Sequence, residues 1–166
     1  MKRYIKAEVA RKTAAIVAEL LRSKRYRVEV CGSLRRNCEE VGDIDIVSNA
    51  PIEEIPRLMK DSRLTVHNGI GGASKKLQLE INGIQVDFYV ADERNWDAAV
   101  LFLTGSAMFN IMMRGEAKRK GFLLNQYGLF RNNVAVAGTE EQIFALLGMK
   151  YRFPNERNKG LKEVER

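Results

Sequence analysis

Three aspartates lie where strands are predicted, and their spacing suits the binding of divalent cations. Asp43 and Asp45 are two residues apart around the start of a predicted strand, so both side chains point to the same face of a sheet. Asp87 lies in a second predicted strand, whose apolar residues alternate toward the opposite face. Burying ionised carboxylates beside one another is costly unless a cation compensates. Three oxygen ligands without histidine or thiolate favour Mg²⁺ or Mn²⁺ over zinc, although each aspartate taken alone is more simply a loop cap or an ordinary strand residue.

A short segment before the aspartate pair has the composition of a phosphate-binding turn. Gly32-Ser33 ends a predicted strand, and Arg36 follows where a helix would begin. A small turn with free backbone N–H groups, a hydroxyl and an arginine beside a helix N-terminus can hold phosphate oxygens. A Gly-Ser pair alone occurs in almost any protein. Its combination with Arg36, with the segment Gly42–Asp45 and with a distant strand aspartate is much more specific.

Hydrophobic periodicity and turn signals predict the elements that carry these residues. Ile5, Val9, Ile16, Val17 and Leu20 recur at helical spacing and predict an amphipathic helix over residues 5–23. Asn82-Gly83 between two alternating runs predicts a hairpin. The remaining predicted segments are strands at 28–31, 44–47 and 64–67, hairpin strands at 77–81 and 84–90, helices at 51–60, 95–103, 106–120 and 139–147, a flexible connector at 69–72, and a small hairpin-like turn between 122–124 and 128–130. Strands followed by helices indicate an α+β fold.

The charges of the chain are distributed unevenly. Its 166 residues include 28 basic and 21 acidic side chains, with a net charge of +7 over residues 1–27 and of −5 over residues 28–100. This pattern fits a centre that holds cations and outer surfaces that bind an anionic polymer, although a solvated surface with accidental blocks would look the same. One histidine and two cysteines exclude a histidine-rich zinc site and a disulfide scaffold. The longest apolar run is far shorter than the roughly 18 residues of a bilayer span.

Three stretches of the chain resemble DNA polymerase family X, within the nucleotidyltransferase superfamily. They are GSLRRNCEEVGDIDIV, IQVDFYV and LTGSAMFNIMMR, and two later stretches, NQYGLF and TEEQIFALLGMKYRFPNER, resemble the end of that family's thumb. The resemblance runs from about Val28 to Arg157. It implies a nucleotidyltransferase-type palm, a mixed sheet with helices on one face, over residues 1–100 with an N-terminal helix. It further implies a small, mostly helical thumb over 101–157 and a flexible basic tail over 158–166, a reduced form similar to compact viral members.

The resemblance also implies a role for individual residues. Asp43, Asp45 and Asp87 would be catalytic and would bind two Mg²⁺ ions, for which Mn²⁺ could substitute, with Asp87 near the primer 3′-OH. The residues implied in nucleotide binding are Gly32, Ser33, Arg36, Gly42, Leu103, Thr104, Gly105 and Asn110. Ser33 and Arg36 would hold the β- and γ-phosphates. The residues implied in DNA binding are Lys75, Arg114, Lys118, Arg119 and Lys120.

Several positions depart from the family pattern. Gln85 replaces an arginine that commonly stands two residues before the third aspartate, so Asp87 would lose a restraint. Phe102-Leu103 replaces a frequent Tyr-Phe pair, Asn125-Gln126 replaces Asn-Glu, and Ile111 stands where a lysine near the templating base is frequent. These departures predict altered sugar selection and loose base selection.

The function implied is that of a DNA-directed DNA polymerase, which adds dNTPs to a primer 3′-OH by two-metal phosphoryl transfer, releases pyrophosphate and fills short gaps in DNA repair. Expected partners are gapped or primer–template DNA, dNTPs and a DNA ligase. With no apolar span and no secretion signal, we expect a soluble intracellular monomer without membrane contact, cytoplasmic or associated with a virion. Two alternatives stay open: a nucleotidyltransferase acting on a non-DNA acceptor, and a catalytically silent DNA-binding module.

Overall fold

The computed structural model describes residues 1–73 and 75–159, which form two compact units. The first unit is Met1–Asp92 and the second is Glu93–Arg166, and each is described by itself. The division expected at residue 100 would fall inside α4 (Trp96–Thr104), which belongs wholly to the second unit. Of the basic tail expected at 158–166, residues 160–166 lie outside the described residues.

The first unit is built on a five-stranded sheet in the order β2-β4-β7-β6-β5. Its strands are β2 (Val28–Val30), β4 (Ile44–Ser48), β5 (Val66–Ala73), β6 (Lys76–Ile81) and β7 (Ile84–Val90). The pair β4 and β7 is parallel and the other neighbours are antiparallel, so the sheet is mixed. Two short strands, β1 (Ile5–Lys6) and β3 (Glu40–Val41), pair separately. This arrangement confirms the predicted α+β class with a mixed sheet.

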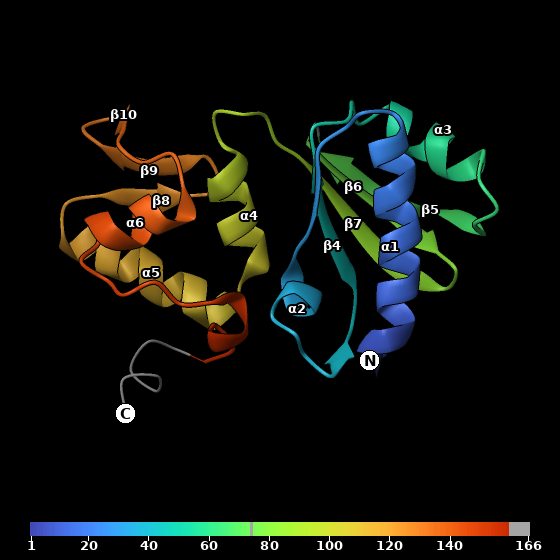
Figure 1. Ribbon diagram of the computed structural model, residues 1–166, viewed down its shortest axis with the longest axis horizontal. Coiled ribbons are helices and arrows are strands. Elements are labelled where there is room, and N and C mark those ends of the chain that lie inside the picture. The colour runs from blue at the N-terminus through green and yellow to red at the C-terminus, as the bar shows by residue number, and fades with distance from the viewer. Residues whose placement is uncertain (74, 160–166) are drawn as a thin grey trace. The chain divides into compact units, whose positions relative to one another are not determined.

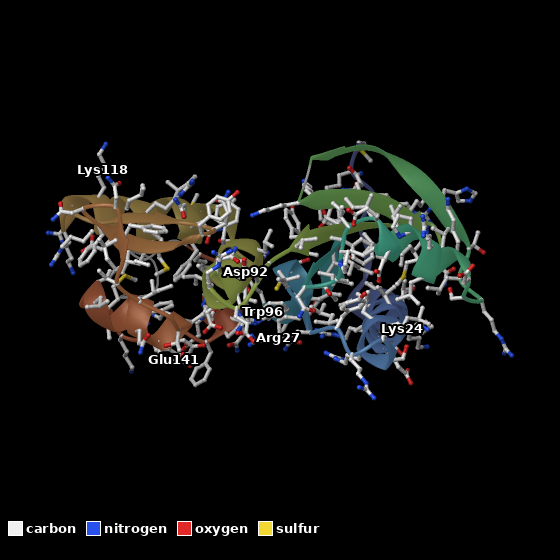
Figure 2. The ribbon with its side chains drawn as sticks, turned by 90° about the horizontal axis from the view of Figure 1, so that it is seen from above. Lys24, Arg27, Asp92, Trp96, Lys118 and Glu141 are labelled. Carbon is white, nitrogen blue, oxygen red and sulfur yellow. The ribbon has the colours of Figure 1, made fainter. Side chains whose placement is uncertain are left out.

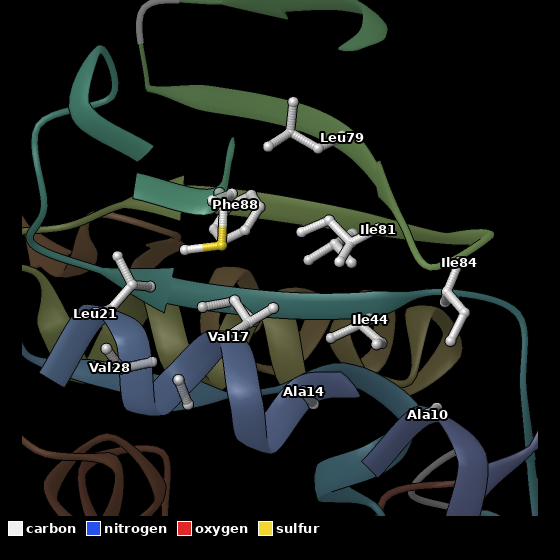
Figure 3. Close-up of a cluster of buried hydrophobic side chains, with 14 of the residues drawn as sticks. Ala10, Ala14, Val17, Leu21, Val28, Ile44, Leu79, Ile81, Ile84 and Phe88 are labelled. Carbon is white, nitrogen blue, oxygen red and sulfur yellow. The ribbon is translucent and has the colours of Figure 1, made fainter. Parts of the chain in front are cut away.

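The helices α1 (Ala7–Ser23) and α3 (Glu54–Lys60) cover one face of this sheet, as Figure 1 shows. The alternation of side chains along each strand decides which strand residues face the two helices. One hydrophobic cluster contains residues of both helices together with the fully buried Ile44 and Ile46 of β4 and Val86 and Phe88 of β7. Figure 3 shows α1 packed against these strands. Because successive strand residues point to opposite faces, Asp45 and Asp87 project from the other face.

The buried face of α1 differs from the prediction. The residues of α1 that are buried are mostly small. They are Ala7, Ala10, Thr13, Ala14, Val17, Ala18 and Leu21. Val9 and Ile16, expected in the core, are 54% and 45% exposed. The alanines at every third or fourth position let the helix backbone approach the sheet closely, so the larger side chains are turned outward. The helix also begins two residues later than predicted, because Ile5 and Lys6 form β1.

Three other segments of the first unit differ in structure from the prediction. The connector expected at 69–72 is wrong, because these residues are part of β5, whose pairing with β6 shifts register between Asn68 and Gly72. Of the strand expected at 64–67, only residues 66 and 67 are in a strand, as the beginning of the same element. The helix expected from residue 51 begins at Glu54, after a turn.

Cys31 and Cys38 are free thiols.

The second unit combines three helices with a small antiparallel sheet (Figure 1). In chain order it contains α4 (Trp96–Thr104), α5 (Ala107–Arg119), β8 (Leu123–Asn125), β9 (Gly128–Arg131), β10 (Val134–Ala135), α6 (Glu140–Leu146) and the 3₁₀ turn η1 (Pro154–Glu156). Ser106 caps α5 by accepting a hydrogen bond from the Phe109 amide, and Thr139 and Gln142 form a capping box at the start of α6. No helix within the described parts of the chain is long and apolar enough to cross a membrane.

A buried arginine holds the second unit together at its C-terminal end. Arg157 has no exposed surface, and its guanidinium donates to Glu140 Oε1 at 3.0 Å and to the Arg152 carbonyl at 2.9 Å. It also lies 5.2 Å from the centroid of the Phe144 ring. The amide of Ser106 donates to the Arg157 carbonyl at 3.1 Å, so this residue ties the end of the chain to the start of α5.

Candidate active site

Asp45 and Asp87 lie next to each other on the face of the first unit's sheet opposite α1 and α3. The parallel register of β4 and β7 pairs Ile44 with Val86 and Asp45 with Asp87. Neighbouring strands are about 4.8 Å apart, so the two carboxylates share one small region. The same register that buries the isoleucine and valine side chains against α1 therefore brings the two acids together.

Burial and mutual repulsion raise the pKa of both acids. Desolvation, followed by repulsion from Asp43 and Asp87, raises the pKa of Asp45 to about 7. Desolvation also raises the pKa of Asp87, against the hydrogen bond from Gln85 and the charge of Lys76. Ionising these carboxylates therefore has a cost in free energy, which a bound cation would offset.

Gly32 places the predicted phosphate-binding turn directly against Asp45. Its φ of +62° lies in the left-handed region, and a Cβ built there would lie 3.1 Å from Asp45 Cγ and closer still to Oδ2. The Cys31 amide donates to the Asp45 carbonyl at 2.7 Å, which fixes the strand end at the turn. Gly32 begins the short helix α2 (Gly32–Arg35), in which Ser33 is half-buried, and the half-buried Arg36 is its C-cap. The structure thus sets Gly32 against Asp45, whereas the roles of Ser33 and Arg36 stay a prediction.

Asp43 is arranged differently from the other two acids. Its Oδ2 accepts a hydrogen bond of 3.0 Å from Lys2 Nζ. Among residues 1–73 and 75–159, no three His, Cys, Asp or Glu side chains are gathered closely enough to hold a metal ion. The negative charge of Asp43 raises the pKa of Asp45. The three carboxylates do not, however, converge on one point as expected. Their joint role as metal ligands therefore stays a prediction.

Gln85 restrains Asp87, although the sequence predicted the loss of a restraint at this position. Its side-chain nitrogen lies 3.3 Å from each carboxylate oxygen of Asp87. Gln85 and Asp87 are two residues apart on β7 and therefore share a face. The amide supplies the orientation that an arginine would supply, without its charge.

Two basic residues near the acids were missed from the sequence. One is Lys2. The other is Lys76 on β6, which is paired with Tyr89 of β7 and has its Nζ 5.1 Å from the centre of that ring. Its charge lowers the pKa of both Asp45 and Asp87. Counting back from the two-residue turn at Asn82-Gly83 would have placed Lys76 opposite Tyr89, whereas no local signal connects Lys2 with Asp43.

In the second unit, Asn110 and Arg114 of α5 line one pocket. The other residues of this pocket are Ala98, Leu101, Phe102, Met113, Leu124 and Asn125. The Asn110 amide nitrogen donates to the Phe102 carbonyl at 2.6 Å, which ties α5 to α4. The side chain of Thr104 is buried and its hydroxyl donates to the Val100 carbonyl at 2.6 Å. Leu103 is half-buried and Gly105 is buried at the end of α4.

The residues expected to bind DNA differ in how accessible they are. Lys75, Arg114 and Lys118 are exposed, and Figure 2 shows Lys118 pointing away from α5 into solvent. Arg119 pairs with Glu116 on the same helix. Lys120 donates to the Leu147 carbonyl at the end of α6 and lies 3.5 Å from Glu116. Lys120 therefore has a structural contact that the sequence did not predict.

Comparison with known proteins identifies the family. Residues 99–158 match the family model described as the DNA polymerase beta thumb. A "Repair DNA polymerase X" of African swine fever virus is 30% identical over 151 residues, which cover 84% of this chain and 86% of that protein. The same protein from another isolate of this virus is 29% identical over the same span. "DNA polymerase IV" of Saccharomyces cerevisiae is 40% identical over 75 residues, 45% of this chain and 13% of that protein.

These similarities cover both units. The thumb match begins inside α4 and ends just after Arg157, so it spans the core of the second unit. The longer matches extend through most of the chain, including the first unit. The chain therefore belongs to DNA polymerase family X, as a compact nucleotidyltransferase with a palm and a thumb.

Proposed function

We propose that this chain fills short gaps in DNA during repair, adding dNTPs to a primer 3′-OH with the help of two divalent cations, Mg²⁺ or in its place Mn²⁺. The observation that carries the proposal is the parallel register of β4 on β7, which sets Asp45 beside Asp87. Gly32 then lies against the same carboxylate, in the turn that we assign to phosphate binding. A carboxylate pair next to a phosphate-binding turn is the arrangement that metal-dependent phosphoryl transfer requires.

The donor set fits hard divalent cations. Asp45 and Asp87 offer carboxylate oxygens, and burial raises the pKa of both side chains. Asp43 adds a third carboxylate, whose negative charge acts on the other two. Oxygen donors without histidine or cysteine suit Mg²⁺ and Mn²⁺. We assign Asp43, Asp45 and Asp87 as the ligands. Bound cations would supply positive charge at the primer hydroxyl and at the triphosphate.

The chain's own residues position the reactants. Gln85 fixes both oxygens of Asp87, so that carboxylate presents one orientation to the primer 3′-OH. Ser33 and Arg36 follow Gly32 and would hold the β- and γ-phosphates through a hydroxyl and a guanidinium. In the second unit, Asn110 would contact the incoming base and Arg114 the template strand. The exposed Lys75 and Lys118 would bind backbone phosphates.

The product of this reaction defines the step that follows it. Filling a gap completely leaves a 3′-OH next to a 5′-phosphate, so a DNA ligation must consume the product. We propose that the chain acts as a soluble intracellular monomer in such a sequence, either in the cytoplasm or in a virion. Its basic ends, with a net charge of +7 over residues 1–27, would contribute to DNA binding.

The test is nucleotide addition on a one-nucleotide gap, with Asp87→Asn as the variant. This substitution keeps the shape of the side chain and removes its charge, and we expect it to abolish addition while DNA binding is retained. Asp61→Asn is the matched control, because Asp61 is exposed at the end of α3. Full activity of Asp87→Asn in Mg²⁺ would refute the assignment.

The same assay separates the alternatives that the sequence left open. Addition that follows the templating base, and that is faster on a gap than on an open primer–template, supports gap filling. Addition without a template, or to RNA alone, would indicate a nucleotidyltransferase for another acceptor. Binding of DNA without addition of any nucleotide would indicate a silent binding module.

A further inference from the structure

Lys2 is held beside the first aspartate by the short sheet of β1 and β3. Ile5 pairs with Val41 and Lys6 pairs with Glu40, and the Ala7 amide donates to the Glu39 carbonyl at 2.8 Å. The segment Gly42-Asp43 follows β3 directly. The antiparallel pairing therefore brings the residues before β1 alongside the residues after β3, and Lys2 reaches Asp43 across 41 positions of the sequence.

Gly42 provides the space through which Lys2 reaches the acid. A Cβ built on Gly42 would lie 3.0 Å from Lys2 Cδ, 3.1 Å from Nζ and closer still to Cε. Any side chain at position 42 would thus displace the lysine. The Lys2 stem lies over Gly42, and its ammonium donates to Asp43 Oδ2 at 3.0 Å.

The contact is well placed to be exchanged for a stronger one. The side chain of Lys2 is 55% exposed and that of Asp43 is 20% exposed. An ion pair so exposed to water contributes little to stability and is readily broken. A divalent cation at the same oxygen brings twice the charge of an ammonium, so it would prevail over the lysine at Asp43.

We propose that Lys2 is a displaceable counter-ion of Asp43, which occupies this carboxylate in the metal-free protein and leaves it when a divalent cation binds. The inference rests on the proposed role of Asp43 as a metal ligand. Lys2 is then a positioning residue: it holds Asp43 in place before the metal arrives and competes with the metal for one oxygen. The consequence is a higher metal concentration at half-saturation than the carboxylates alone would require.

A purely structural ion pair makes the opposite prediction. If Lys2 only fastened β1 to β3, its removal would lower the melting temperature and leave the affinity for divalent cations unchanged. The two roles are separated by measuring metal binding directly, without DNA, nucleotide or turnover.

The experiment is a titration of the full chain with Mn²⁺, followed by the electron paramagnetic resonance of the free ion. We expect Lys2→Ala to bind Mn²⁺ about two- to tenfold more tightly than the wild type, as removal of a weakly bound competitor requires. Arg3→Ala is the matched control, because Arg3 has the same charge on the same segment and forms no hydrogen bond or ion pair within the described residues. Lys2→Arg should stay near the wild-type affinity.

A second readout follows Lys2 itself. In the chain with ¹³C-methylated lysines, the Lys2 resonance, assigned through Lys2→Arg, should move as Mg²⁺ is added, and it should not move in Asp43→Asn. Equal Mn²⁺ affinity of Lys2→Ala and wild type, or a Lys2 resonance that stays fixed while metal binds, would overturn the inference alone. If Mn²⁺ binding is also insensitive to Asp45→Asn and Asp87→Asn, the metal site of the proposed function fails, and the inference fails with it.

Discussion

The close approach of Gly32 to Asp45 gives a prediction whose size can be worked from the structure. In Gly32→Ala, the new methyl would overlap the Asp45 carboxylate, and the residue would keep a φ of +62°. An L-residue in the left-handed region costs about 1–2 kcal/mol. The overlap with a buried neighbour costs about 1–3 kcal/mol more. We therefore expect the free energy of unfolding to fall by about 2–5 kcal/mol.

Gly83→Ala is the matched control for this substitution. Gly83 has a φ of +77°, and a Cβ added to it would meet no atom within 4 Å, so its variant bears the backbone cost without the overlap. We expect Gly83→Ala to lose only about 1–2 kcal/mol. The difference between the two variants, about 1–3 kcal/mol, isolates the contact with Asp45.

Two assays test the reasoning together. Urea unfolding monitored by circular dichroism gives the stability of each variant, and primer extension on gapped DNA gives kcat. Because a displacement of about 1 Å at a reacting group can cost about 100-fold in rate, we expect kcat of Gly32→Ala to fall by that order while Gly83→Ala keeps the wild-type value. Equal stability losses in the two variants, or an unchanged kcat in Gly32→Ala, would show that Gly32 does not set the position of Asp45.

Three further predictions concern the acids and the core of the second unit. Because burial raises the pKa of Asp45 to about 7 from an ordinary 3.8, its contribution to stability is complete below pH 3.8 and is lost as the pH rises through 7. In urea unfolding with EDTA present, the stability of Asp45→Asn relative to the wild type should therefore rise by up to about 4 kcal/mol between pH 4 and pH 8. A stability difference that stays constant over this pH range would contradict the shift. Gln85→Leu removes the hydrogen bonds that lower the pKa of Asp87, so the acidic limb of the kcat–pH profile should move to higher pH and kcat should fall about tenfold. Gln85→Arg should keep the wild-type profile and the wild-type kcat. An unchanged profile in Gln85→Leu would contradict the role of Gln85. Arg157→Met leaves Glu140 buried without its ion pair and should cost about 3–5 kcal/mol, and adding Glu140→Gln should recover part of this loss; additive losses in the double variant would exclude the coupling.

Much of the site's framework could be predicted from local sequence patterns. The Asn82-Gly83 turn fixes the pairing of β6 with β7, and the alternation along β7 turns Asp87 away from the apolar core. Each depends on residues within a few positions of one another, where backbone geometry alone decides which face a side chain occupies.

What the sequence could not supply depends on long-range contacts. The pair of Lys2 with Asp43 needs β1 and β3, each only two residues long and too short to show any alternation. The buried face of α1 consists largely of alanines, so a search for large apolar side chains selected Val9 and Ile16, which are exposed. The glycines at 69–72 predicted a connector, yet these residues continue β5, whose pairing with β6 breaks after Asn68 and resumes at Gly72.

The central claim is that Asp43, Asp45 and Asp87 together bind the divalent cations used for nucleotide addition. The most direct measurement is anomalous diffraction from crystals of the full chain grown with Mn²⁺, gapped DNA and a non-hydrolysable dNTP. We expect two Mn²⁺ peaks within about 2.3 Å of oxygens from these three carboxylates, with Lys2 no longer bonded to Asp43. Peaks that touch none of the three, or a Mn²⁺ bound while one of them points away from both ions, would contradict the account.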